Sequence, residues 1–162
     1  MQQPGGTFGW LEATPLSLAM RTDLWLYPAV EIVHILGFVV LVGGVVLFDL
    51  RLLGVARTLP VDALARHLLR WSLSALVLII PAGLMMFSAH PQDFISNRIF
   101  LLKLTLIAAA GINAAMFHLG VYRSVAAWNM NTATPLAARA HAIVSIAIWV
   151  SVISCGRLLA YT

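Results

Sequence analysis

The sequence predicts an all-α membrane protein, an up-down bundle of four transmembrane helices. Of the 162 residues, 61% are hydrophobic and only 10% are charged. Because soluble domains carry roughly 25% charged residues, this composition excludes an ordinary water-soluble protein. Four apolar segments are each long enough to cross a bilayer, which takes about 20 helical residues.

The chain divides into a polar N-terminal tail, residues 1–23, and a transmembrane domain, residues 24–162. A cleavable signal peptide has basic residues ahead of a short apolar run. The tail lacks this pattern, so we expect no cleavable signal. We expect this tail to lie in the periplasm, with an interfacial segment around Pro15–Met20.

The four expected spans are Leu24–Phe48, His67–Phe87, Ile99–His118 and Ala142–Tyr161. The linkers between them are short and contain Pro60, Pro91 and Pro135, a residue that favours loops over helix interiors. Short connections place consecutive helices antiparallel, which gives the up-down order. Glycine and alanine occur on all four spans, and such small residues let helices approach closely in lipid.

Positive charge indicates the orientation. Six basic residues go with the first and third linkers (Arg51, Arg57, Arg66, Arg70, Arg123 and Arg139), and four go with the other side (Arg21, Arg98, Lys103 and Arg157). The positive-inside rule then predicts a multi-pass protein of the bacterial inner membrane with both termini in the periplasm. The basic residues form no stripe or RNA-binding motif, so we expect no nucleic-acid partner.

Glu31 and His34 are ionisable residues inside the first apolar span, three positions apart and therefore on one helix face. With a helical rise of about 1.5 Å per residue, Glu31, Lys103 and Arg157 fall about 8–9 Å to the outer side of their span midpoints. We expect a structural ion pair between Glu31 and Arg157, because a guanidinium can hold a carboxylate bidentately. His34 lies nearly one turn deeper. It is either a core histidine hydrogen-bonded to Glu31 or to a backbone carbonyl, or a ligand or proton-relay residue.

Three histidines share a level at the inner side of the membrane: His67, His118 and His141. They lie about 13–16 Å from the midplane. A b-type haem needs one or two imidazoles, a slot of small residues, and cations for its propionates. Gly43, Gly44 and Ser145 are candidate lining residues, and Arg70 or Arg123 are candidate propionate partners. His67 and His141 would clamp a haem across the bundle, with His118 able to replace either.

Haem b is the leading cofactor on this reasoning. For a haem near His34, Lys103 and Arg157 are the available cations. Copper is the alternative, because Met85, Met86 and Cys155 offer soft ligands towards the outer end, with His34 deeper. A di-iron carboxylate site is excluded, since it needs a second Glu-x-x-His motif and further buried acids. The single cysteine excludes a Cys-rich metal centre and an internal disulfide.

The run VHILGFVVLVGGVVLFDLRLLG resembles the first helix of a small bacterial inner-membrane family. Further matching positions are Phe100 with Lys103, GIN at 111–113, FH at 117–118, and Trp149 with GR at 156–157 and Tyr161. That family is loosely similar to the membrane part of copper-resistance protein D and to four-helix b-type cytochromes. The resemblance covers the chain from residue 24 onward and implies a bundle with a haem or copper role. His34 and His118 lie within its motifs, whereas His67 and His141 do not.

The functional expectation is a b-type cytochrome-like protein that moves electrons within a larger redox assembly. Expected partners are the lipid bilayer, a quinone, other membrane redox subunits or a second copy of the chain. The alternatives are a copper-handling membrane protein and a non-catalytic assembly subunit. The sequence has no nucleophile–base pairing or phosphate loop, which favours an electron-transfer or accessory subunit over a stand-alone enzyme.

Overall fold

The computed structural model describes residues 8–161, and all regular secondary structure in that range is helical. Four long helices dominate it: α3 (Leu26–Leu53), α5 (Arg70–Ala89), α7 (Arg98–Leu119) and α8 (Leu136–Leu158). A short helix α4 (Val61–Leu64) and a π-helical turn η1 (Ala65–Leu69) lead directly into α5. The structure thus has four long helical segments, which we call rods: Leu26–Leu53, Val61–Ala89, Arg98–Leu119 and Leu136–Tyr161. Each is long and apolar enough to cross a membrane, as the sequence predicted. The first seven residues of the expected tail, and Thr162, lie outside the described residues.

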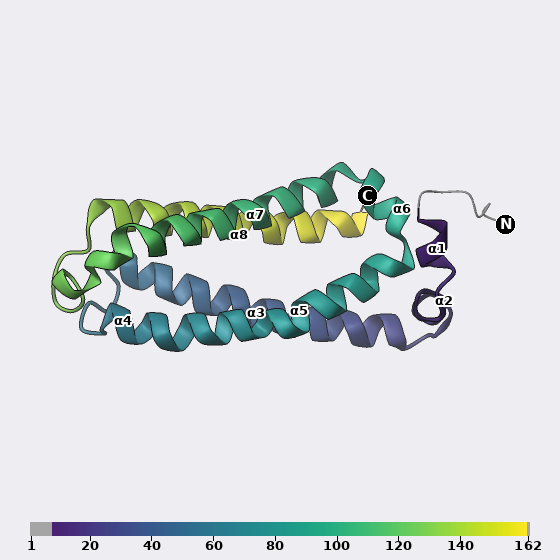
Figure 1. Cartoon of the computed structure of the whole chain (residues 1–162), viewed down its shortest axis with the longest axis horizontal. Helices are drawn as coiled ribbons and strands as arrows, with labels where there is room; N and C mark the ends of the chain where they lie inside the picture. The colour runs from purple at the N-terminus through teal and green to yellow at the C-terminus, as the bar shows by residue number, and fades with distance from the viewer. Residues whose placement is uncertain (1–7, 162) are drawn as a thin grey trace.

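The long helices form two antiparallel pairs (Figure 1). Helices α3 and α5 make the first hairpin, helices α7 and α8 make the second, and the hairpins pack together mainly through α3 and α8. Helices α5 and α7 follow each other in the chain but make little direct contact. The α5 side of the first hairpin is therefore only loosely joined to the α7 side of the second.

The helix ends differ from the expected span ends. Helix α3 continues past Phe48 to Leu53 and stops at Gly54, whose φ of 108° lies in the left-handed region that favours glycine. Helix α8 begins at Leu136, directly after Pro135 and well before the expected start at Ala142. Hydropathy marks where apolar residues begin, whereas capping residues decide where a helix begins and ends, so the two limits differ.

Glycines set the close approach of α3 and α5. A Cβ atom on Gly37 would lie 2.8 Å from the Ile79 side chain, and one on Gly44 would lie 2.3 Å from the Ser72 hydroxyl. Gly43 and Gly111 have no such neighbour within 4 Å. The expectation that small residues allow close packing is therefore confirmed for Gly37 and Gly44, which are placed on the contact face of α3.

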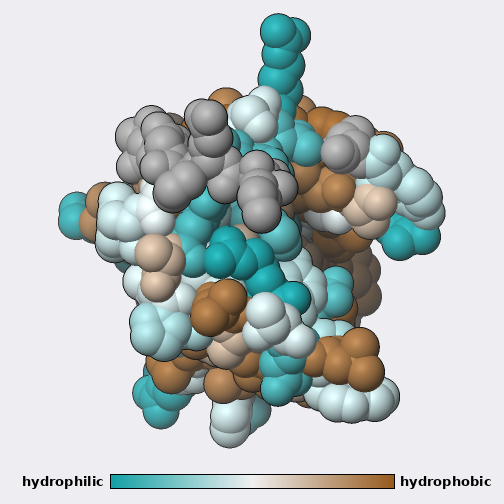
Figure 2. Space-filling model, turned by 90° about the vertical axis from the view of Figure 1, so that its right-hand side faces the viewer, coloured by the Kyte–Doolittle hydropathy of each residue, from teal (hydrophilic) through white to brown (hydrophobic). Residues whose placement is uncertain are grey.

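One end of the bundle, which we call the terminal end, carries four short elements. These are α1 (Gly9–Glu12), α2 (Pro15–Thr22), α6 (Pro91–Ser96) and the C-terminal turn η3 (Leu159–Tyr161). Viewed onto this end, hydrophilic residues gather across the middle of the face and hydrophobic residues show at its sides (Figure 2). Helix α2 covers the segment in which we expected an interfacial element, and it packs on α5. There the Ser17 hydroxyl donates a hydrogen bond of 2.7 Å to the carbonyl of Ser88.

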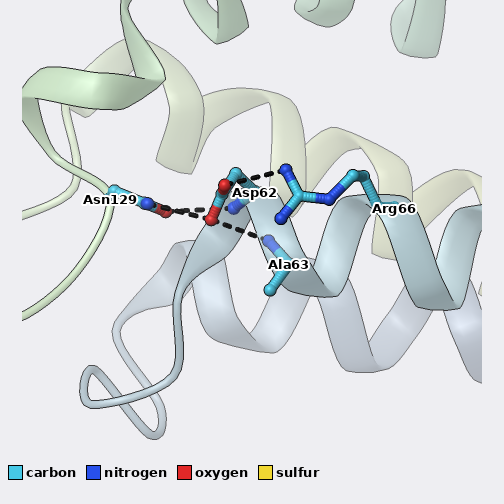
Figure 3. Close-up of polar contacts among 4 residues, drawn as sticks. All are labelled: Asp62, Ala63, Arg66 and Asn129. Carbon is cyan, nitrogen blue, oxygen red and sulfur yellow. Dashed lines mark hydrogen bonds and ion pairs between the residues drawn. The ribbon is translucent and has the colours of Figure 1, made fainter.

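The opposite end, which we call the loop end, carries residues 54–60 and 120–135, including the 3-10 helix η2 (Val121–Ala127). Hydrogen bonds join these two segments. Asn129 donates from its amide to the Asp62 carboxylate at 2.9 Å and accepts from the Asp62 backbone N–H at 3.0 Å (Figure 3). Arg66 pairs with the same carboxylate at 2.9 Å. Asp62 thus joins the segment 120–135 to the start of α4, while the Asn131 N–H donates to the Arg57 carbonyl at 2.9 Å and joins the two loops directly.

A hydrophobic core lies beneath these loops. Its buried members come from all four rods and from the third linker: Phe48, Leu52, Val61, Ala65, Phe117, Trp128, Ala138 and Ala142. The core fixes the loop-end parts of α5, α7 and η2 relative to one another, and these are the elements that border the candidate site.

Candidate functional site

A groove at the loop end separates α5 from α7. It has a cavity volume of about 560 Å³ and is lined by Ala65, Arg66, Leu69, Arg70, Leu73, Ser74, His118 and Tyr122. Near the terminal end the two helices do meet, where Phe87 of α5 stacks on Phe100 of α7 with ring centroids 6.0 Å apart, so the groove is confined to the loop end. Two of the residues expected to bind a cofactor, His118 and Arg70, meet in this groove.

His118 is held in a defined orientation within the groove. Its Nδ1 donates a hydrogen bond of 2.8 Å to the carbonyl of Ala114, one turn earlier on α7. A carbonyl only accepts, so Nδ1 carries the proton and Nε2 of the neutral imidazole carries the lone pair. The ring also packs against Phe117 and Tyr122, each with ring centroids 5.1 Å away. His118 therefore offers one nitrogen, Nε2, to a ligand.

Two guanidinium groups and a phenol complete the polar part of the groove. Arg70 is exposed and forms no ion pair among the described residues, whereas Arg66 is bound to Asp62. Burial raises the pKa of Tyr122, the charge of Asp62 raises it further, and Arg66 opposes this, so the phenol stays protonated at neutral pH. With Leu69 and Leu73 on the wall, the groove suits an amphiphilic ligand that carries negative charge at one edge.

The other two histidines of the inner level do not line this groove. His141 donates from Nδ1 to the Asn113 side-chain oxygen at 2.8 Å, and the Asn113 amide donates to the His141 carbonyl at 3.1 Å. The ring of Phe117 contacts both imidazoles, at 5.1 Å from His118 and 5.9 Å from His141. His67 is exposed. The structure thus gathers His118 with Arg70, but not with His67 or His141, in one ligand-sized space.

The other residues that we expected to line a haem do not lie in this groove. Gly44 faces Ser72 of α5, Gly43 is exposed, and Ser145 forms a hydrogen bond with Asp49. Arg123 is exposed and outside the groove lining. Across residues 8–161, no group of three or more His, Cys, Asp or Glu side chains is placed to hold a metal ion.

His34 lies between α3 and α5 in the half of the bundle near the terminal end. Its Nδ1 donates a hydrogen bond of 3.0 Å to the carbonyl of Ile79, and a Cβ on Gly83 would lie only 3.2 Å from its ring. The charges of Lys103 and Glu31 both act on its imidazole. The half-buried Lys103 ammonium lies beside Gly156 of α8, 3.6 Å from where a Cβ would be. The charge of Lys103, on the second hairpin, therefore reaches His34 on the first.

Glu31 is exposed, and the expected ion pair between Glu31 and Arg157 is not formed in the described part of the chain. Arg157 instead donates to the hydroxyl of Tyr161 and lies 4.9 Å from the centroid of that ring. Tyr161 is one turn away on the same helical segment, so this partner is reached without bridging two helices. The soft-ligand candidates Met85 and Met86 pack against the core residues Met20, Val30, Ala82 and Ala89.

The sequence reasoning missed Asp49 and Arg51. Both were taken to lie beyond the first span, yet they are only 5% and 2% exposed. The sequence did hold a sign that the helix continues past them. They follow an apolar run, and no helix-terminating residue occurs before Gly54.

Neither a curated protein nor a solved structure matches the chain significantly. The likeness to copper-resistance protein D and to b-type cytochromes gains no support from these comparisons. One family model, described as a family of unknown function (DUF6644), matches residues 7–162. Since the match covers nearly the whole chain, the protein belongs to the DUF6644 family.

Proposed function

We propose that the protein is an integral protein of the bacterial inner membrane that would hold haem b in the groove between α5 and α7 through the His118 imidazole. It passes electrons within a larger membrane redox assembly. The observation that carries this proposal is the meeting of the His118 imidazole, two arginines and an apolar wall in one groove.

The donor set fits a haem. A b-type haem requires an imidazole nitrogen, an apolar surface for the macrocycle, and cations for the propionates. His118 offers Nε2 because Nδ1 is bound to Ala114, and the side chains of Leu69 and Leu73 offer the apolar surface. The volume of about 560 Å³ lies within the range of about 300–1,000 Å³ that is usual for small-molecule and cofactor sites.

Each groove residue then has a task. The Ala114 carbonyl holds the imidazole in one tautomer, as second partners of ligating histidines commonly do. Arg70 would hold a propionate carboxylate, for which the guanidinium fork is well shaped, while Arg66, paired with Asp62, would add positive charge at the edge of the groove. Tyr122 packs on the imidazole and restricts its rotation. When bound, haem supplies reversible one-electron chemistry.

The proposed setting is a lipid bilayer crossed by all four rods as an up-down bundle. In support, the outward faces of the rods carry many exposed large apolar side chains, and each rod is long enough to cross. The positive-inside rule puts the loop end and its groove at the cytoplasmic face and both termini in the periplasm. Because the groove faces outward between two helices, a quinone or a partner subunit can approach it from the membrane.

The test is the haem content of protein purified in detergent, measured as a Soret band and by the pyridine haemochrome assay. The proposal expects about one haem per chain. A matched pair of variants locates the ligand: His118→Ala should lose the haem, whereas His90→Ala, in an exposed linker position, should keep it. A wild-type protein without haem contradicts the proposal, and haem retained by His118→Ala contradicts the assignment of the ligand.

A further inference from the structure

Asp49 is a carboxyl group enclosed within the bundle near the loop end of α3. It is only 5% exposed, and its neighbour Phe48 belongs to the loop-end core. The carboxyl group hydrogen-bonds with the hydroxyl of Ser145 on α8, which is itself 7% exposed. The other carboxyl oxygen, Oδ2, has no hydrogen-bond partner in the described part of the chain. Among the described residues, the Ser145 hydroxyl is thus the polar partner identified for this carboxyl.

Among residues 8–161, no cation forms an ion pair with Asp49. Arg51, two residues further on, is directed to the loops, where Nε donates to the carbonyl of Leu59 at 2.7 Å and one terminal nitrogen donates to that of Asn129 at 3.0 Å. The titratable groups on the elements that pack against this part of α3 are Asp62, Arg66, His67, Arg70, His118, Tyr122, Arg139 and His141. None of them forms an ion pair with Asp49 in the described structure.

An ionised carboxylate in such a place is strongly disfavoured. Burial removes its hydration, and an isolated buried charge is neutralised by binding a proton unless a counter-charge compensates it. A neutral carboxylic acid fits the observed contacts better. The Ser145 hydroxyl is a single neutral partner and does not replace the hydration that burial removes. In the neutral acid the unpartnered oxygen carries no charge, which costs far less than an unpaired charged oxygen.

We infer that Asp49 is a proton-binding site inside the membrane domain, occupied by a proton at neutral pH. Ionisable residues within membrane segments commonly mark proton paths. Asp49 lies on the last two turns of α3, so its proton exchanges with the aqueous phase at the loop end. This inference does not depend on haem, because it concerns only the carboxyl and its surroundings.

The experiment is infrared spectroscopy of the purified full-length protein in lipid. The spectrum of the variant Asp49→Asn is subtracted from that of the wild type. A carboxylic-acid C=O band at neutral pH that shifts in D₂O and disappears in the variant is expected. Ser145→Ala should move the band to higher frequency without removing it, because the hydrogen bond is lost but the proton stays. Asp62→Asn is the matched control and should leave the band unchanged, since Asp62 is paired with Arg66.

Two results overturn the inference. One is the absence of any carboxylic-acid band at neutral pH, and the other is a band that persists in Asp49→Asn and so belongs to a different group. If Asp49→Asn does not fold, carboxyl ¹³C NMR of wild-type protein labelled at aspartate gives the same decision. A protonated Asp49 resonance, assigned by its loss in Asp49→Glu, supports the site, and an ionised one overturns it.

Discussion

The Nδ1 atom of His34 lies 3.0 Å from the carbonyl oxygen of Ile79 and joins α3 to α5 in the half of the bundle nearer the terminal end. Gly83, one turn after Ile79, leaves room for the imidazole. Hydrogen bonds between membrane helices contribute modestly, on average about 0.6 kcal/mol in double-mutant cycles. This contact matches the alternative in which His34 is a core histidine bonded to a backbone carbonyl; the sequence did not reveal that the carbonyl is that of Ile79.

The variant His34→Ala should therefore lower the free energy of unfolding by about 0.5–2 kcal/mol and keep the haem, because the proposed axial ligand is His118. Thermal unfolding in detergent and the Soret absorbance measure the two effects on one sample. Loss of haem in His34→Ala with an unchanged melting temperature would contradict the structural role of His34 and move the cofactor to the terminal-end half.

Adjacent glycines on α3 make a matched test of helix packing. Gly44→Ala should destabilise the protein by about 1–3 kcal/mol, because its Cβ would lie 2.3 Å from the Ser72 hydroxyl, displacing it from its hydrogen bond to the Leu41 carbonyl, and only 3.2 Å from the Leu68 carbonyl. Gly43→Ala should be neutral or slightly stabilising, since no neighbour lies within 4 Å of its Cβ. Equal melting temperatures for the two variants would show that α3 does not contact α5 through this face.

Arg51 clamps the loop end, because its guanidinium donates to the carbonyls of Leu59, Arg57 and Asn129. Arg51→Lys keeps the charge but removes the fork, so we expect a loss of roughly 2–3 kcal/mol. Cleavage by added protease in residues 54–60 and 129–134 should also become faster. The exposed Arg139 supplies the control, and Arg139→Lys should change neither measurement. Unchanged proteolysis of Arg51→Lys would be inconsistent with the clamp.

Charge in the groove should govern how tightly haem is held. Arg70→Gln removes a guanidinium that has no ion-pair partner among the described residues, and we expect haem affinity to fall about 5- to 50-fold, as for the loss of a charge-assisted hydrogen bond. Arg123→Gln is the control, because Arg123 is exposed and outside the groove. Haem titration followed by absorbance measures both. A larger loss in Arg123→Gln than in Arg70→Gln would place the propionates elsewhere.

The features that sequence predicted are those set by composition along the chain. Apolar length identified all four rods, and proline placed their linkers. The partners of the polar residues depend on how each helix is rotated about its axis. Helices in lipid are apolar on nearly all sides, so their hydrophobic pattern carries little information about rotation. The expected clamp of His67 and His141 and the expected pair of Glu31 and Arg157 both required that information.

Two further contacts show the same limit. His118 bonds to Ala114 one turn away, a contact that local spacing can suggest, whereas His141 bonds to Asn113 on another helix. Asp49 lay at the expected end of the first span, where water would normally solvate it. Its burial arises because α8 and the loop-end core cover it, and those residues are distant in sequence.

The most direct test of the central claim is haem binding by wild type, by His118→Gly, and by His118→Gly supplied with free imidazole. Imidazole can enter the space left by the missing side chain and donate its nitrogen to the same position. The account predicts a Soret band in wild type, its loss in His118→Gly, and its return with imidazole. Wild type without a Soret band, or His118→Gly with an unchanged one, would contradict it.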